Sequence, residues 1–204
     1  MKIEYLISPS SILQKKTNCY FKDAIKVYSL EEFKKVCSHD YMCGRFKNNY
    51  RKDENFIITN SIPMDMDNKH SDNPKEWITV ADIKSLFEGV PFLVIYSRNH
   101  MKPKEGRFPR PKFHIIFKSN EITDAIKLEE LKKKVLEICP YFDNEALGAS
   151  RFFFGTTNPT VEYVDDNITT DEFIANEDEK LERFYPLGES IEEGKKIKLC
   201  IKLH

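Results

Sequence analysis

The chain has 204 residues, of which 40% are hydrophobic and 12% aromatic, and this excludes a disordered protein and favours a packed globular one. Its 32 basic and 33 acidic residues leave a formal net charge of −1. That balance excludes a protein that coats nucleic acid by bulk charge, so any contact with nucleic acid requires a local basic patch.

The first half of the chain gives signals for one helix and one long strand. Ser29, followed three residues later by Glu32, has the pattern of a capping box and predicts a helix. Residues 56–67 are rich in β-branched and apolar types and predict a strand. Pro63 inside that run indicates a sheet edge or a bend, because proline cannot donate to the ladder.

A second helix and a short buried strand follow. Thr79 and Asp82 form another capping-box pattern, and Gly89 is suited to ending the helix that they begin. The apolar run at residues 92–97 predicts a buried strand. Residues 99–111 then form a loop of basic residues and prolines.

The remaining elements alternate strand and helix. Residues 112–117 predict a strand. Apolar residues recur at helical spacing before Pro140 and predict a helix; they are Leu128, Leu131, Val135 and Ile138. Residues 151–155 and 161–164 are interpreted as a strand pair around a Thr-Asn-Pro turn. Residues 196–203 alternate like a half-buried strand.

The irregular mixture of helices and hairpins favours an α+β fold with a mainly antiparallel sheet. Glycine-rich phosphate loops of the GxGxxG and GxxxxGK[ST] types do not occur, which argues against Rossmann and P-loop sites. We expect one domain over residues 1–204, with an N-terminal part (1–50), a core that carries the motifs (51–170) and a closing segment (171–204).

The cysteines and the apolar runs indicate the cellular compartment in which the protein is expected. Five cysteines without a CxxC pair argue against a zinc site or a disulfide framework and favour a reducing cytoplasm. No run of about 18 apolar residues occurs, so no membrane contact is expected. The N-terminal residues lack the apolar core of a secretory signal.

Asp65 and Asp67 are the first candidate site residues. On a strand, residues two apart share a face, so both carboxylates point the same way while Met64 and Met66 point into the core. Two like charges side by side repel each other unless a hard divalent cation takes both as oxygen ligands. The alternative is a solvated strand end, because a DxD pattern alone is common.

His114 lies within the predicted strand 112–117, next to the basic loop. Neutral or charged, an imidazole can hydrogen-bond a phosphate oxygen, whereas the alternative is a histidine packed in the core. Basic residues cluster around that loop, where they form a plausible arm for binding a triphosphate or a template backbone; they are Arg98, Lys102, Lys104, Arg107, Arg110 and Lys112.

Asp143 is the third candidate carboxylate and follows the helix that ends near Pro140. It can simply cap the next turn, and Glu145 is a competing carboxylate nearby. With Asp65 and Asp67 it would complete a cluster able to hold two metal ions. Arg151, at the head of the aromatic segment, is placed to pair with Asp143 or to reach a phosphate.

The motifs at Asp65 and Asp67 (MDMDN), His114 (RPKFHIIF) and Asp143 (FDNEALGASRFFFG) together resemble the archaeo-eukaryotic primase superfamily, and most closely the primase-polymerases of phages and mobile elements. The order and wording of these segments carry the resemblance, which covers roughly residues 45–166. Lys112 stands where the family commonly has a serine.

The resemblance implies an α/β module beside a sheet related to RNA-recognition domains. It implies two Mg²⁺ or Mn²⁺ ions on Asp65, Asp67 and Asp143, and His114 on the triphosphate, with Lys112, Arg98, Arg110 and Arg151 as further nucleotide-binding candidates. The implied activity is primer synthesis or DNA polymerisation from NTP or dNTP on a single-stranded DNA template. A helicase in cis or in trans is an expected partner, and the implied setting is the cytoplasm of a bacterial host.

Two other functions remain open, and a third is disfavoured. A metal-dependent nuclease also uses clustered aspartates and a histidine, but it needs no triphosphate grip. A rolling-circle initiator would need an HxH motif, which does not occur. A non-catalytic module that binds single strands would stack bases on aromatic side chains. Because neighbours on a strand alternate faces, at most Phe152 and Phe154 would share one, and a core position is the alternative for them.

Overall fold

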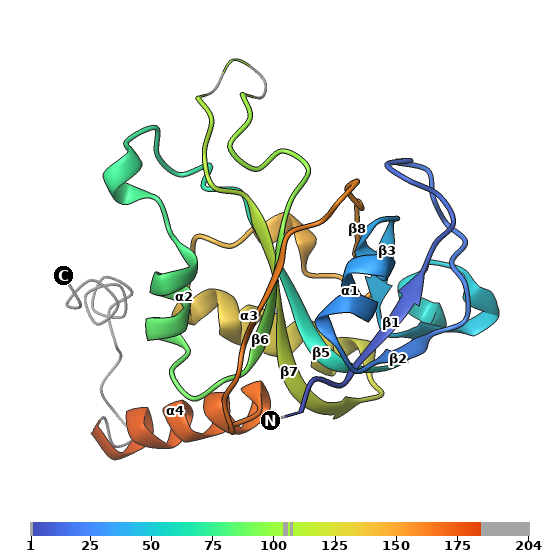
Figure 1. Ribbon diagram of the computed structural model, residues 1–204. Helices are drawn as coiled ribbons and strands as arrows, with labels where there is room; N and C mark the ends of the chain where they lie inside the picture. The colour runs from blue at the N-terminus through green and yellow to red at the C-terminus, as the bar shows by residue number, and fades with distance from the viewer. Residues whose placement is uncertain (1, 104–105, 107, 185–204) are drawn as a thin grey trace.

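The computed structural model describes residues 2–103, 106 and 108–184. Within these residues four α-helices and two antiparallel sheets form an α+β fold, which confirms the predicted class (Figure 1). The first sheet has the order β2-β1-β3-β8, with β1 (Tyr5–Pro9), β2 (Ile25–Val27), β3 (Tyr41–Cys43) and β8 (Phe152–Phe153).

The second sheet is larger and carries the predicted motifs. Its order is β4-β5-β7-β6-β9, with β4 (Arg45–Phe46), β5 (Phe56–Met66), β6 (Phe92–Tyr96), β7 (Phe113–Ile122) and β9 (Val161–Val164). The helices are α1 (Leu30–Cys37), α2 (Val80–Leu86), α3 (Ala125–Ile138) and α4 (Thr170–Phe184). None of the described helices is both long and apolar enough to cross a membrane.

The predicted helix starts are present. Thr79 and Asp82 form a complete capping box at α2, and Gly89, with φ of +93°, follows that helix in the left-handed region that favours glycine. At α1, Ser29 accepts the Glu32 N–H, but the Glu32 carboxylate accepts from the N–H of Tyr28 rather than from that of Ser29. The box is therefore displaced by one residue.

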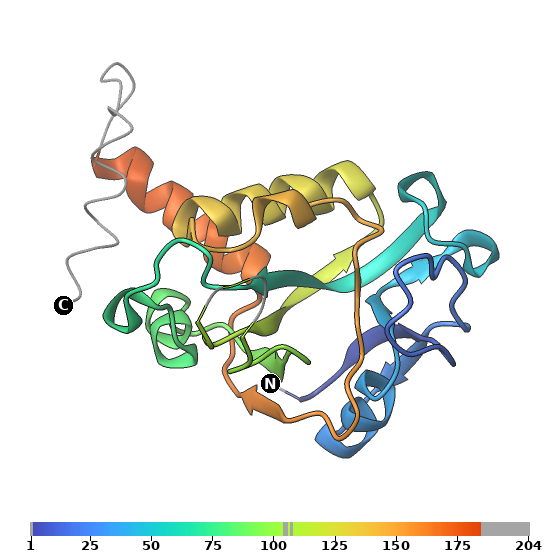
Figure 2. The same ribbon diagram turned by 90° about the horizontal axis from the view of Figure 1, so that it is seen from above.

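The second sheet is covered on both faces. On one face, Phe92 and Val94 of β6 belong to a core with α2, α3 and α4. On the other, Leu93 and Ile95 belong to a core with the first sheet and α1. Figure 2 shows the same layering, with α3 and α4 on one side of the sheet and the N-terminal strands on the other. A strand buried on both faces explains the continuous apolar run predicted for residues 92–97.

Pro63 lies in β5, opposite Ile116 of β7. On the other side of β5, β4 pairs at Phe56 and Ile58 and does not extend as far as Pro63. Around Pro63 the strand is therefore at a local edge of the sheet, as expected for a residue that cannot donate to a ladder.

The predicted pairing of residues 151–155 with residues 161–164 is wrong. β8 pairs with β3 in the first sheet, whereas β9 pairs with β6 in the second. The chain crosses from one sheet to the other between them, because Phe153 and Val161 each help to fill the core that the two sheets share. The predicted strand at 196–203 lies outside the described residues.

Candidate active site

Three carboxylates converge at one end of β5. Asp65 lies near the end of that strand and Asp67 directly after it, while Met64 and Met66 are buried in the core on the opposite face. The backbone N–H of Asp143 donates to the carbonyl of Asp65 over 2.8 Å. The side chains of Asp65 and Asp143 are each 13% exposed, so the cluster is largely shielded from solvent.

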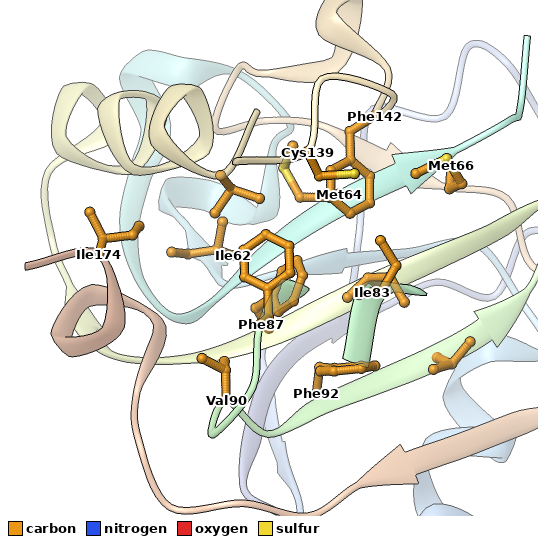
Figure 3. Packing of buried hydrophobic residues seen from close by; sticks show 14 of the residues in the cluster. Ile62, Met64, Met66, Ile83, Phe87, Val90, Phe92, Cys139, Phe142 and Ile174 are labelled. Atoms are coloured by element: carbon orange, nitrogen blue, oxygen red, sulfur yellow. The ribbon is translucent and has the colours of Figure 1, made fainter. Parts of the chain in front are cut away.

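Core packing brings Asp143 to this place. Cys139 and Phe142, which follow α3, are buried in the same core as Met64 (Figure 3). One Asp143 oxygen accepts the Glu145 N–H over 3.2 Å and so caps a short 3₁₀ turn, Asn144–Ala146. The other oxygen faces Lys69 and Arg151. Asp143 therefore both caps the turn and belongs to the carboxylate cluster.

Cations stand between the carboxylates. Lys69 Nζ lies 3.5 Å from Asp67 Oδ2 and 3.7 Å from Asp143 Oδ2. Arg151 Nη2 lies 3.1 Å from Asp65 Oδ2 and 3.9 Å from Asp143 Oδ2. Each of these nitrogens therefore bridges two carboxylates. Burial lowers the pKa of Lys69, but the carboxylates around it outweigh burial and raise that pKa overall.

Lys112 also reaches the cluster, with its Nζ 3.8 Å from Asp67 Oδ1 and its side chain 8% exposed. Lys112 is one of the residues expected from the sequence, whereas Lys69 is not. Its position two residues after Asp67 was the available signal.

His114 lies directly opposite Asp65 in the β5–β7 ladder, and its Nε2 is 3.8 Å from Asp65 Oδ1. Its Nδ1 lies 3.1 Å from the hydroxyl of Tyr41 on β3. Burial lowers the pKa of His114 more strongly than Asp65 raises it, which favours a neutral ring. The imidazole thus joins the carboxylate cluster to the core between the two sheets.

Arg110 does not belong to the cluster. Arg110 is 1% exposed. Its guanidinium donates to the carbonyls of Asn68 and Ser71 and forms an ion pair with Asp72. These partners hold the loop that follows the acidic pair. With these partners Arg110 positions that loop, and its direct contact with a nucleotide stays an untested prediction.

Arg98 also has other partners. Its guanidinium packs over the ring of Phe154 at 4.3 Å, and Nη1 donates to Gln14 over 2.9 Å. It is thereby directed toward the first sheet rather than toward the carboxylates. Lys102 is exposed, and Lys104 and Arg107 lie outside the described residues.

The three carboxylates offer oxygen ligands, which hard divalent cations prefer. Among the described residues, no three His, Cys, Asp or Glu side chains already form a metal-binding group. However, Asp143 contacts Lys69 together with Asp67, and it contacts Arg151 together with Asp65. The three carboxylates are therefore close enough for neighbouring pairs of them to contact the same cation. Oxygen ligands of this kind suit Mg²⁺ or Mn²⁺, which would be held by Asp65, Asp67 and Asp143.

The turn that presents Arg151 is braced from two sides, which the sequence did not indicate. Lys132 of α3 is fully buried and donates to the carbonyl of Gly148 over 3.0 Å. Asp53 accepts the N–H of Ser150 over 2.6 Å. Burial, with Arg151 nearby, lowers the pKa of Lys132 to about 8.

Lys132 should make stability depend on alkaline pH. Its folded pKa is about 8, below its ordinary value of 10.5, so between these values the unfolded chain binds more protons and the unfolding free energy rises with pH. The Lys132→Met variant lacks this rise. From pH 7 to pH 10.5, wild type should gain about 3 kcal/mol relative to the variant.

Denaturant unfolding of both proteins across this pH range measures the difference. Lys127→Met, at an exposed position on the same helix, serves as the control and should track wild type. Parallel curves for wild type and Lys132→Met would show that the buried amine keeps its ordinary pKa.

Comparison with known proteins gives one distant structural likeness. No protein-family model and no curated protein matches the chain. Its structure is similar to the archaeo-eukaryotic primase domain of the cyanophage S-2L primase-polymerase, with a TM-score of 0.43 and 12% identity over 98% of this chain and 89% of that one. At this level a likeness does not say which residues act, so the functional conclusion depends on the carboxylate cluster itself.

Proposed function

We propose that this chain is a template-directed nucleotidyltransferase, a DNA primase or polymerase that uses two Mg²⁺ or Mn²⁺ ions. The observation that carries the proposal is the meeting of Asp65, Asp67 and Asp143 at one end of β5, with His114 opposite Asp65. Carboxylates from two distant segments gain nothing from proximity by themselves, because like charges repel. Their clustering beside several cations supports a site built for a charged ligand and its counter-ions.

In this mechanism the three aspartates hold the ions, which when bound would activate a 3′-hydroxyl and neutralise the leaving pyrophosphate. Lys112 and Arg151 offset the charge of the triphosphate as it enters. The Nε2 of His114 is directed toward the cluster. In the neutral tautomer that carries its proton on Nε2, this nitrogen donates to a phosphate oxygen. Because the side chains of Lys112 and His114 are each only 8% exposed, their electrostatic effect exceeds that of exposed side chains.

Incorporation of nucleotides on a single-stranded DNA template tests the proposal. Purified chain, Mg²⁺ or Mn²⁺ and either ribo- or deoxynucleotides are supplied, with and without a primer. We expect products longer than the primer, or new primers, that require both the metal and a complementary nucleotide. The ribo and deoxy arms identify the preferred substrate.

Two outcomes would replace this proposal. Shortening of the DNA in metal, without incorporation, would identify a nuclease. Strand binding that is equal in metal and in chelator, without either reaction, would identify a binding module.

A further inference from the structure

Two phenylalanine side chains, each covered by an arginine, lie at β8 and the residue after it, at the edge of the first sheet. Phe152 and Phe154 lie 5.1 Å apart between ring centroids. Arg51 packs over the Phe152 ring at 4.5 Å, and Arg98 packs over the Phe154 ring at 4.3 Å. Phe153, between them in sequence, is buried in the core instead. We call Arg51, Phe152, Phe154 and Arg98 the arginine–phenylalanine row.

The row is only partly buried. All four of its side chains are of intermediate exposure, and three distant segments supply them. Phe152 also meets Phe21 edge to face at 6.0 Å, so one side of its ring is anchored. A planar guanidinium stacked on a partly exposed ring offers both a flat apolar surface and a positive charge.

Basic segments surround the row. Arg51 is tied to residues 14–22, because its Nε donates to the carbonyl of Asn18 and its backbone N–H to that of Cys19. At the other end of the row, Arg98 donates to Gln14. Residues 14–23 and 47–54 contain six basic residues and three acidic ones, and Lys52 lies 3.5 Å from one of the acids, Glu54. The basic residues are Arg51, Lys15, Lys16, Lys22, Lys47 and Lys52. In a chain of net charge −1, this is a local basic patch.

An exposed aromatic side chain extends the surface. Tyr20 is 68% exposed and meets Tyr50 edge to face at 4.9 Å. It comes from the same basic segment that flanks Phe152 through Phe21. Aromatic faces among cations suit a polymer that has flat bases and a charged backbone.

We propose that the arginine–phenylalanine row, with Tyr20 and the surrounding lysines, binds single-stranded nucleic acid and leads it to the carboxylate cluster. Arg151, which contacts Asp65, directly precedes Phe152, so the surface and the cluster share one segment. The proposal deepens the proposed function, on which it rests for the identity of the strand as template. A single strand is the favoured occupant because a duplex hides its base faces.

Fluorescence anisotropy with a labelled oligonucleotide of about 20 nucleotides tests this surface, in chelator and over a range of salt. Arg51→Gln with Arg98→Gln should weaken binding about tenfold and reduce the salt dependence by between one and two counter-ions. Tyr20→Ala, at an exposed position that does not support the core, should weaken binding about fivefold through lost stacking. A matched control, Lys84→Gln with Lys127→Gln, removes two exposed charges from α2 and α3 and should bind like wild type.

Strand affinity and nucleotide incorporation, measured on the same proteins, distinguish the proposed binding surface from the proposed catalytic role. Asp65→Asn with Asp67→Asn should keep strand affinity within about twofold, because the row does not include the acidic pair. Strand binding by the wild-type protein without any incorporation would leave the surface standing and remove the catalytic role. Wild-type affinity in both the double arginine variant and Tyr20→Ala, or tighter binding of duplex than of single strand, would overturn the surface.

Discussion

Replacing Asp65 and Asp67 together by asparagine should reduce nucleotide incorporation by at least about a thousandfold. Asparagine keeps the size and shape of each side chain but removes the two negative charges. Lys69, Lys112 and Arg151 would then face a cluster with one carboxylate in place of three. A divalent ion would lose its charged ligands, and the triphosphate would lose the ions that neutralise it.

The measurement is the rate of primer extension at saturating metal and nucleotide, with thermal unfolding recorded for each protein. The control is Glu121→Gln with Glu130→Gln, which removes the same charge from exposed positions on β7 and α3. The control should extend primers at the wild-type rate. An acidic-pair variant that is equally active would exclude both residues from the mechanism.

Replacing His114 by alanine should raise the KM for the nucleoside triphosphate by about 10- to 100-fold, with a smaller effect on kcat. A hydrogen bond to a charged phosphate contributes about 1.5–3 kcal/mol, which corresponds to that change in affinity. The imidazole also packs against Phe153, with ring centroids 4.4 Å apart, so the alanine variant loses core contacts as well. The unfolding temperature must therefore be measured with the kinetics.

Two further variants separate binding from packing. His114→Gln retains an amide N–H near the position of Nε2 and should recover part of the affinity that alanine loses. Tyr41→Phe leaves the ring of His114 in place but removes the hydroxyl that faces Nδ1. A KM that alanine leaves unaltered, despite a lower unfolding temperature, would make His114 a purely structural residue.

Part of the site followed from the sequence through local geometry. Residues two apart on a strand share a face, and this rule placed Asp65 and Asp67 opposite the buried methionines. The capping pair Thr79 and Asp82 and the short apolar run of β6 were equally local signals, and both elements form as predicted. Such features depend on backbone geometry that a few neighbouring residues determine.

Other features depended on contacts between distant segments. Arg98, Arg110 and Lys112 belong to one basic stretch of the sequence, but they point to three different places. Lys112 faces the carboxylates, Arg110 is buried under the loop after the acidic pair, and Arg98 lies on Phe154. A long basic side chain can reach in many directions, and the sequence does not indicate which partner it meets.

The sequence by itself determined the α+β class, the starts of α1 and α2 and the shared face of Asp65 and Asp67, because short-range periodicity and capping govern all of these. Only the tertiary structure decided that Asp143 joins them and that β8 and β9 belong to different sheets. It also decided that Lys69 contacts the carboxylates and that Lys132 braces the turn before Arg151. The burial of Phe142 positions Asp143, and the burial of Phe153 holds β8 in the first sheet. The physical reason is that apolar side chains distant in sequence fill shared cores.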